Sequence, residues 1–172
     1  MVAHAKAVAN EFLRLASEAG RGIDPLQMQK LLYLSQGWCL GLTGEKLFRE
    51  PIEAWQYGPV VPEIYHALKH YGDRPIKKPL VTFDEEHGAV VPASYQFDDY
   101  LKKVIENVWG AYGGMSGPQL VRLTHEKGAP WDLARRTNPN EENARIATQD
   151  MLAWFDGEAE RARGVNDGNG AS

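Results

Sequence analysis

One long helical segment, apolar around most of its circumference, constrains the fold of this chain more than any other feature. Its start carries Asp24, Pro25 and Gln27, which are a cap residue that can accept a backbone N–H, a proline suited to the first turn and an amide that can reach back to the cap. Apolar residues then recur at helical spacing to about Leu42. A helix with so little polar surface is typically buried, so we expect this segment at the centre of the fold.

Shorter patterns surround this central segment. Helices are predicted where apolar residues recur at steps of three and four or where capping residues stand. These segments are 3–19, 62–71 and 97–112, with shorter helices starting at about Ser116, Pro130 and Thr148. The segment 50–59 is typical of a short strand or extended loop, and 81–83 with 89–91 is typical of a β-hairpin. The predicted fold class is therefore α+β, mostly α: a compact multi-helix domain with a small antiparallel β element.

The end of the chain differs in composition from the rest. From Gly157 the sequence is charged, and Gly164–Ser172 is small and polar with Val165 as its one sizeable apolar residue. Such a segment buries too little apolar surface to offset the entropy of ordering it. We therefore expect a single domain over residues 1–156 and a polar, disordered, flexible C-terminal tail over residues 157–172.

Composition and charge exclude several classes of protein. The 172 residues correspond to about one domain, and a single cysteine rules out an internal disulfide. The formal charge is −4, from 19 basic and 23 acidic side chains, with no basic lobe, so we do not expect a general electrostatic grip on nucleic acid. No run of apolar residues is long enough for a membrane span and no secretory signal is visible, so a cytoplasmic protein is expected, with no membrane partner. The acidic surface suits a basic partner.

No group of residues predicts a catalytic or metal site, and we expect no cofactor. Cys39 lies mid-helix on the apolar face, which favours a buried, inert thiol over a nucleophile. His66 and His70 share a helix face and could hold a metal with Glu63, but surface histidines are the more common reading of this spacing. Two alternatives to a binding module stay open: a small enzyme that uses Cys39 or the histidine pair, and a DNA-binding autoregulator.

The most unusual stretch runs from Trp55 to Tyr65. Large aromatic residues flank Gly58-Pro59, and Pro62 opens the next helix, which makes a stiff turn. The aromatic rings could pack as core against the helix of Leu31–Trp38, or they could form a rigid binding edge that loses little entropy on docking. The candidate partner-binding residues are Trp55, Gln56, Tyr57, Gly58, Pro59, Val60 and Tyr65, and the candidate supporting core residues are Leu31, Tyr33, Leu34 and Trp38.

These motifs resemble a known family, the Panacea-domain or SocA-like antitoxins. The stretches that carry the resemblance, which covers about Ala3–Phe155, are Gln29–Trp38, Leu47-Phe48, Pro51–Trp55, Tyr57–Tyr65, Leu120–His125 and Pro130-Trp131. The resemblance implies a mostly helical domain with a small β element. It also implies an antitoxin of a bacterial or phage toxin–antitoxin system that neutralises a cognate protein toxin by contact, without catalysis. Some members resemble adaptors that deliver the toxin to an ATP-dependent protease of the ClpXP type. The family pattern does not define the toxin-binding surface.

Overall fold

Helix α2 (Pro25–Thr43) forms the centre of the molecule, as its apolar sequence predicts. The computed structural model of the protein describes residues 2–168. Both halves of the predicted capping box are present: the Asp24 side chain accepts from the Gln27 N–H at 2.8 Å, and the Gln27 side chain accepts from the Asp24 N–H at 2.9 Å. Gly44, with φ of 77°, ends the helix in the left-handed conformation.

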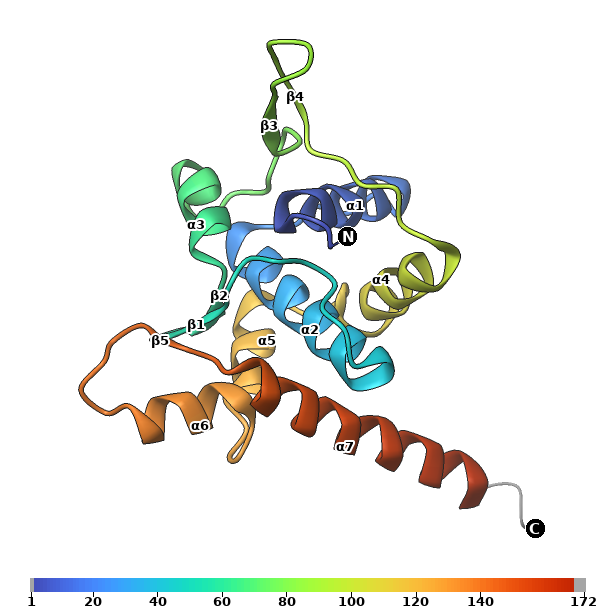
Figure 1. Ribbon diagram of the computed structural model, residues 1–172, viewed down its shortest axis with the longest axis vertical. Coiled ribbons are helices and arrows are strands. Elements are labelled where there is room, and N and C mark those ends of the chain that lie inside the picture. Colours follow the sequence, from blue (N-terminus) through green and yellow to red (C-terminus); the bar gives the residue numbers. More distant parts are fainter. Residues whose placement is uncertain (1, 169–172) are drawn as a thin grey trace.

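Most of the remaining helices cover α2. The helices that pack directly against it are α1 (Ala5–Glu18), α3 (Pro62–Leu68), α4 (Asp99–Tyr112), α5 (Gly117–Thr124) and α7 (Thr148–Gly168) (Figure 1). A 3₁₀ turn, η1 (Lys69–Tyr71), extends α3, and α6 (Pro130–Thr137) lies beside the small sheet. Helices dominate the described residues, which confirms the predicted α+β class with its mostly helical content. None of the helices within residues 2–168 has the length and apolarity needed to cross a lipid bilayer.

Two glycines set the position of α7 on α2. A Cβ atom at Gly37 would lie 2.1 Å from the Phe155 ring, and one at Gly41 would lie 2.6 Å from the Phe155 backbone carbonyl carbon. The rings of Tyr33 and Trp38 meet the Phe155 ring edge-on, with centroid distances of 5.7 and 5.6 Å. Gly37 and Gly41 are four residues apart, so both lie on the same face of α2 and leave it without side chains there. Helix α7 can therefore approach α2 closely and insert the Phe155 ring into the core.

The small sheet has three strands, in the order β2–β1–β5, all antiparallel. Strands β1 (Glu53–Trp55) and β2 (Gly58–Val60) form a hairpin where the sequence predicted one strand or an extended loop. Strand β5 (Ala144–Arg145) pairs with the outer edge of β1 and was not predicted, because two residues are too short to show an alternating pattern.

The predicted hairpin after residue 80 is present as β3 (Val81–Asp84) and β4 (Ala89–Pro92). It projects from the body at the top of Figure 1. The Asn10 side chain of α1 ties its base, because its amide donates to the carbonyl oxygens of Leu80 and Ala93, each at 2.8 Å.

The last helix extends further than the sequence predicted. The tail was expected to begin at residue 157, but α7 continues to Gly168. Ala159 is buried, and the Arg161 guanidinium lies over the Trp154 ring and pairs with Glu158. These contacts stabilise the helix just beyond Phe155, where the apolar stripe that marks it in sequence ends. Residues 169–172, which the predicted tail includes, lie outside the described residues.

Candidate partner-binding site

The β1–β2 hairpin combines a buried strand with an exposed aromatic turn. Gln56 and Tyr57 form the turn between the paired residues Trp55 and Gly58. Tyr57 is 65% exposed and Tyr65, which follows on α3, is 42% exposed. The rings of Trp55 and Tyr65 meet edge-on with their centroids 4.9 Å apart. The second strand, Gly58–Val60, is buried throughout. The second strand therefore packs into the core, whereas the rings of Tyr57 and Tyr65 are exposed and do not pack as core residues. That this segment forms a binding edge stays a prediction.

Gly58 brings the hairpin backbone onto the side chain of Lys30. Its φ of 108° is a conformation that residues with a Cβ rarely adopt. A Cβ atom there would also lie 2.8 Å from the Lys30 Cε and 3.0 Å from the Thr124 Oγ1. Both the backbone angle and the close approach therefore require glycine at this position.

Buried polar side chains of α2 hold the backbone that follows the turn. The Lys30 Nζ donates to the Pro59 carbonyl oxygen at 3.0 Å. The Gln29 side chain accepts from the Val61 N–H at 2.8 Å and donates to the Val61 carbonyl oxygen at 3.2 Å. These bonds satisfy backbone groups that would otherwise be buried without partners, so they orient the turn as well as stabilise it.

A side chain about two turns further along α2 holds another backbone segment in the same way. The Gln36 side-chain oxygen accepts from the N–H groups of Leu47 and Phe48 at 2.7 and 3.1 Å, and its amide donates to the Phe48 carbonyl oxygen at 2.8 Å. Gln29, Lys30 and Gln36 thus attach the chain to α2 both before and after the hairpin.

Lys30 is a buried amine beneath the hairpin. Its side chain is fully buried, and it forms no ion pair with any carboxylate between residues 2 and 168. Burial lowers the pKa of Lys30 to about 7, because removing an ammonium group from water disfavours its charged form. The amine therefore loses its proton far more easily than an exposed lysine does.

His125 lies in the same electrostatic environment. Its ring stacks on the Trp131 ring, with centroids 3.6 Å apart and planes 4° from parallel. Burial lowers the pKa of His125, and the positive charges of Lys30 and Arg135 lower it further. Its Nε2 is buried and has no hydrogen-bond partner in the part of the chain that the structure describes. These surroundings therefore favour the neutral form of His125, whose ring stacks on Trp131.

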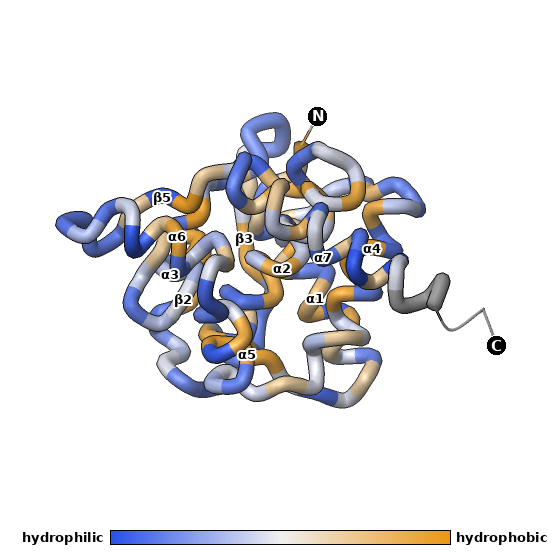
Figure 2. Tube along the Cα trace, turned by 90° about the horizontal axis from the view of Figure 1, so that it is seen from below, coloured by the Kyte–Doolittle hydropathy of each residue, from blue (hydrophilic) through white to orange (hydrophobic). Residues whose placement is uncertain are grey.

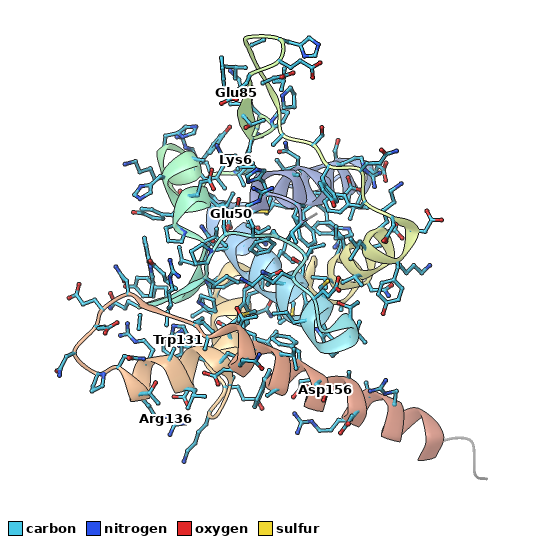
Figure 3. The ribbon with its side chains drawn as sticks, viewed as in Figure 1. Lys6, Glu50, Glu85, Trp131, Arg136 and Asp156 are labelled. Carbon is cyan, nitrogen blue, oxygen red and sulfur yellow. The ribbon has the colours of Figure 1, made fainter. Side chains whose placement is uncertain are left out.

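Helix α6 secures the outer edge of the hairpin. The Trp131 Nε1 donates to the Trp55 carbonyl oxygen at 2.7 Å. The Arg135 guanidinium donates to the carbonyl oxygens of Ala54 and Glu142, at 3.3 and 2.9 Å, and lies 5.6 Å from the centroid of the Trp131 ring. Figure 3 shows Trp131 where α6 faces the sheet, with Arg136 on the opposite side of the helix. The aromatic turn is therefore braced by α2 from beneath and by α6 from the side.

A groove of about 760 Å³ opens beside this braced turn. Its walls come from the start of α2, the hairpin, α3 with η1, and the α6–β5 loop, which Figure 2 shows as hydrophilic along its length. The lining residues are Pro25, Leu26, Gln29, Lys30, Trp55, Gln56, Tyr57, Val60, Tyr65, Lys69, Gly72, Arg135, Glu142 and Asn143. Its volume falls in the range of about 300–1,000 Å³ that is usual for ligand sites.

The structure places the predicted binding residues in two groups. Trp55, Gln56, Tyr57, Val60 and Tyr65 line the groove, whereas Gly58 and Pro59 lie behind it over Lys30. Of the predicted supporting residues, Leu31, Tyr33 and Leu34 are buried and Trp38 is partly buried. The side chains that bond the turn are Gln29 and Lys30, which the sequence analysis did not single out. Both are polar residues in a helix that is apolar around most of its circumference. In such a helix some polar side chains must be buried, and this is the signal that could have identified them.

The candidates for catalysis, Cys39, His66 and His70, are not among the residues that line the groove. Cys39 is buried and contacts Thr43, and burial raises the pKa of its thiol. His66 and His70 are exposed on α3 and η1, where their rings contact Tyr65 and Tyr71. Within residues 2–168, no group of three or more His, Cys, Asp or Glu side chains could hold a metal ion.

The comparisons with known proteins identify the family. The family model for "Antitoxin SocA-like, Panacea domain" matches residues 28–132, a stretch that contains Lys30, the hairpin, His125 and Trp131. Antitoxin SocA of Caulobacter vibrioides is 36% identical over 129 residues, which are 75% of this chain and 69% of that protein. No solved structure matches the chain. The chain therefore belongs to the SocA-like antitoxin family with a Panacea domain.

Proposed function

We propose that this protein is an antitoxin that neutralises a protein toxin by direct binding, with the hairpin turn and its groove as the contact surface. The observation that carries this proposal is a pair of exposed rings, Tyr57 and Tyr65, on a backbone held by buried bonds from Lys30 and Gln29. Aromatic side chains on a rigid backbone lose little conformational entropy on docking, and tyrosines are enriched among the residues that dominate binding energy.

The family supports a binding function over a catalytic one. The curated relative is named as an antitoxin, and the match spans most of this chain. Neutralisation by binding needs a cognate toxin as partner. The net charge of −4 gives no general electrostatic basis for the alternative of a DNA-binding autoregulator.

We also propose that binding delivers the toxin to an ATP-dependent protease of the ClpXP type. Blocking alone leaves the half-life of the toxin unchanged, whereas delivery shortens it. The test is the half-life of the toxin in cells with and without this protein, in strains with and without the protease. A half-life that this protein does not shorten in cells with the protease would leave blocking as the mechanism.

The binding surface predicts the effect of removing one ring. Tyr57→Ala removes a 65% exposed side chain that lines the groove, so the fold should remain intact while toxin affinity falls by about tenfold or more. The measurement is calorimetric titration of the purified toxin, taken as the product of the neighbouring gene whose expression arrests growth. Relief of that arrest should weaken in parallel.

Tyr100→Ala is the matched control for this prediction. Tyr100 lies on α4 and is 53% exposed, so it loses a ring of the same type at a different surface. Equal toxin affinity for wild type and a folded Tyr57→Ala protein would remove the turn from the contact. No toxin binding by the wild type would refute neutralisation by contact itself.

A further inference from the structure

The groove carries positive charge in a protein whose net charge is negative. Lys69 and Arg135 line it together with the fully buried Lys30, and Glu142 is the one carboxylate among the lining residues. The whole chain has a formal charge of −4. The charge of the groove is therefore opposite in sign to the net charge of the chain, from which a basic partner was expected.

These cations are not neutralised within the described chain. Neither Lys69 nor Arg135 forms an ion pair there, and the Arg135 contacts with Ala54 and Glu142 are to backbone carbonyl oxygens. These bonds hold Arg135 in position without an acidic partner, while Lys69 is exposed at the start of η1. Two unpaired cations thus face one groove, one of them held rigidly.

The cations stand next to apolar surface that can anchor a side chain. Trp55 and Tyr65 form an edge-on pair, Tyr57 is exposed beside them, and Leu26 and Val60 complete this wall. The groove thus offers apolar contact in one part and anion recognition in another.

We propose that the groove binds an acidic segment of the toxin, with an aromatic or aliphatic side chain among Trp55, Tyr57 and Tyr65 and carboxylates facing Lys69 and Arg135. This inference rests on the proposed antitoxin function and specifies the chemistry that its surface recognises. A nucleic acid could also use rings and cations, but its affinity depends on many phosphate contacts, which a chain of net charge −4 with two accessible groove cations does not supply.

The test reverses one charge in the groove. Lys69→Glu should weaken toxin binding by about tenfold or more at low salt, and the difference from wild type should shrink as salt is raised from about 50 to 500 mM. Lys103→Glu, on the exposed face of α4, makes the same charge change elsewhere and should leave affinity near the wild-type value. Thermal melting of both variants verifies that they are folded.

A charge-swap series identifies the partner group. Single Asp or Glu residues of the toxin are changed to Lys, and one of these changes should restore binding to the Lys69→Glu protein. Equal affinities of wild type and Lys69→Glu, with toxin still bound, would overturn the acidic-segment proposal and leave the antitoxin function standing. Binding of a single-stranded RNA 12-mer that Lys69→Glu abolishes, with toxin binding unchanged, would assign the groove to nucleic acid. Failure of the wild type to bind toxin would refute the proposed function instead.

Discussion

Gly58→Ala is expected to lower the free energy of unfolding by about 3 kcal/mol. The new methyl group would force a residue with a Cβ into a φ of 108° and would lie 2.8 Å from the Lys30 Cε. Lys30 cannot move aside freely, because its side chain is buried and its Nζ is bonded to the Pro59 carbonyl oxygen. The measurement is equilibrium unfolding in urea, monitored by tryptophan fluorescence and circular dichroism.

Gly88→Ala provides the control for backbone strain alone. Gly88 also has a positive φ, of 60°, but nothing lies within 4 Å of where its Cβ would be. Its substitution should therefore cost about 1 kcal/mol, the strain of a left-handed alanine. Equal losses at Gly58 and Gly88 would show that the close approach to Lys30 and Thr124 adds nothing to the cost of backbone strain.

The fold was predictable where local chemistry and burial agree. Asp24 and Gln27 form a complete capping box, and the helix that they start is apolar enough to require a central place. The hairpin of β3 and β4 was predictable because two apolar runs flank a turn containing Gly88. Strand β5 and the last turns of α7 were not predictable, because they depend on pairing with β1 and on contacts such as Arg161 over Trp154.

The segment that forms the candidate site was predictable, but the residues that hold it in position were not. Proline and aromatic residues marked Trp55–Tyr65 as a stiff segment, and five of its seven candidate residues line the groove. The contributions of Gln29 and Lys30 depend on which residues far along the chain fold back onto α2, and spacing within one helix carries no such information. Arg135 was not predicted as a site residue, because its place in the groove depends on bonds to the carbonyl oxygens of Ala54 and Glu142, which local sequence does not reveal.

The buried amine of Lys30 contributes both to the position of the hairpin turn and to the stability of the fold. Lys30 stays under the hairpin although an apolar residue would avoid the desolvation of a charge, and the bond it gains is one to the Pro59 carbonyl oxygen. A neutral amine still donates that bond, though more weakly than a charged one, and it avoids the cost of burying a charge, so the folded protein tolerates Lys30 best without its extra proton. The position of the turn and the protonation of Lys30 are therefore coupled.

This coupling predicts that wild type gains about 3 kcal/mol of stability relative to Lys30→Met as the pH rises from 7 to 10. Burial lowers the pKa of Lys30 to about 7 in the folded chain, whereas an unfolded lysine keeps its proton to about pH 10. The unfolded chain therefore binds more protons across this window, so raising the pH favours the native state. Methionine has no proton to lose, and its loss of the bond to Pro59 is independent of pH.

The measurement is urea unfolding of both proteins at intervals between pH 7 and 10. Burial and Arg135 lower the pKa of His125 from its ordinary value of 6.5 in both proteins, so its titration lies below this range. Groups such as Tyr33 and Cys39, whose pKa values burial raises, occur in both proteins and cancel in the difference. Lys102→Met, at an exposed position on α4, should differ from wild type by a constant amount. A constant difference for Lys30→Met as well would mean that Lys30 keeps its proton in the fold, and that another group must then stabilise the buried charge.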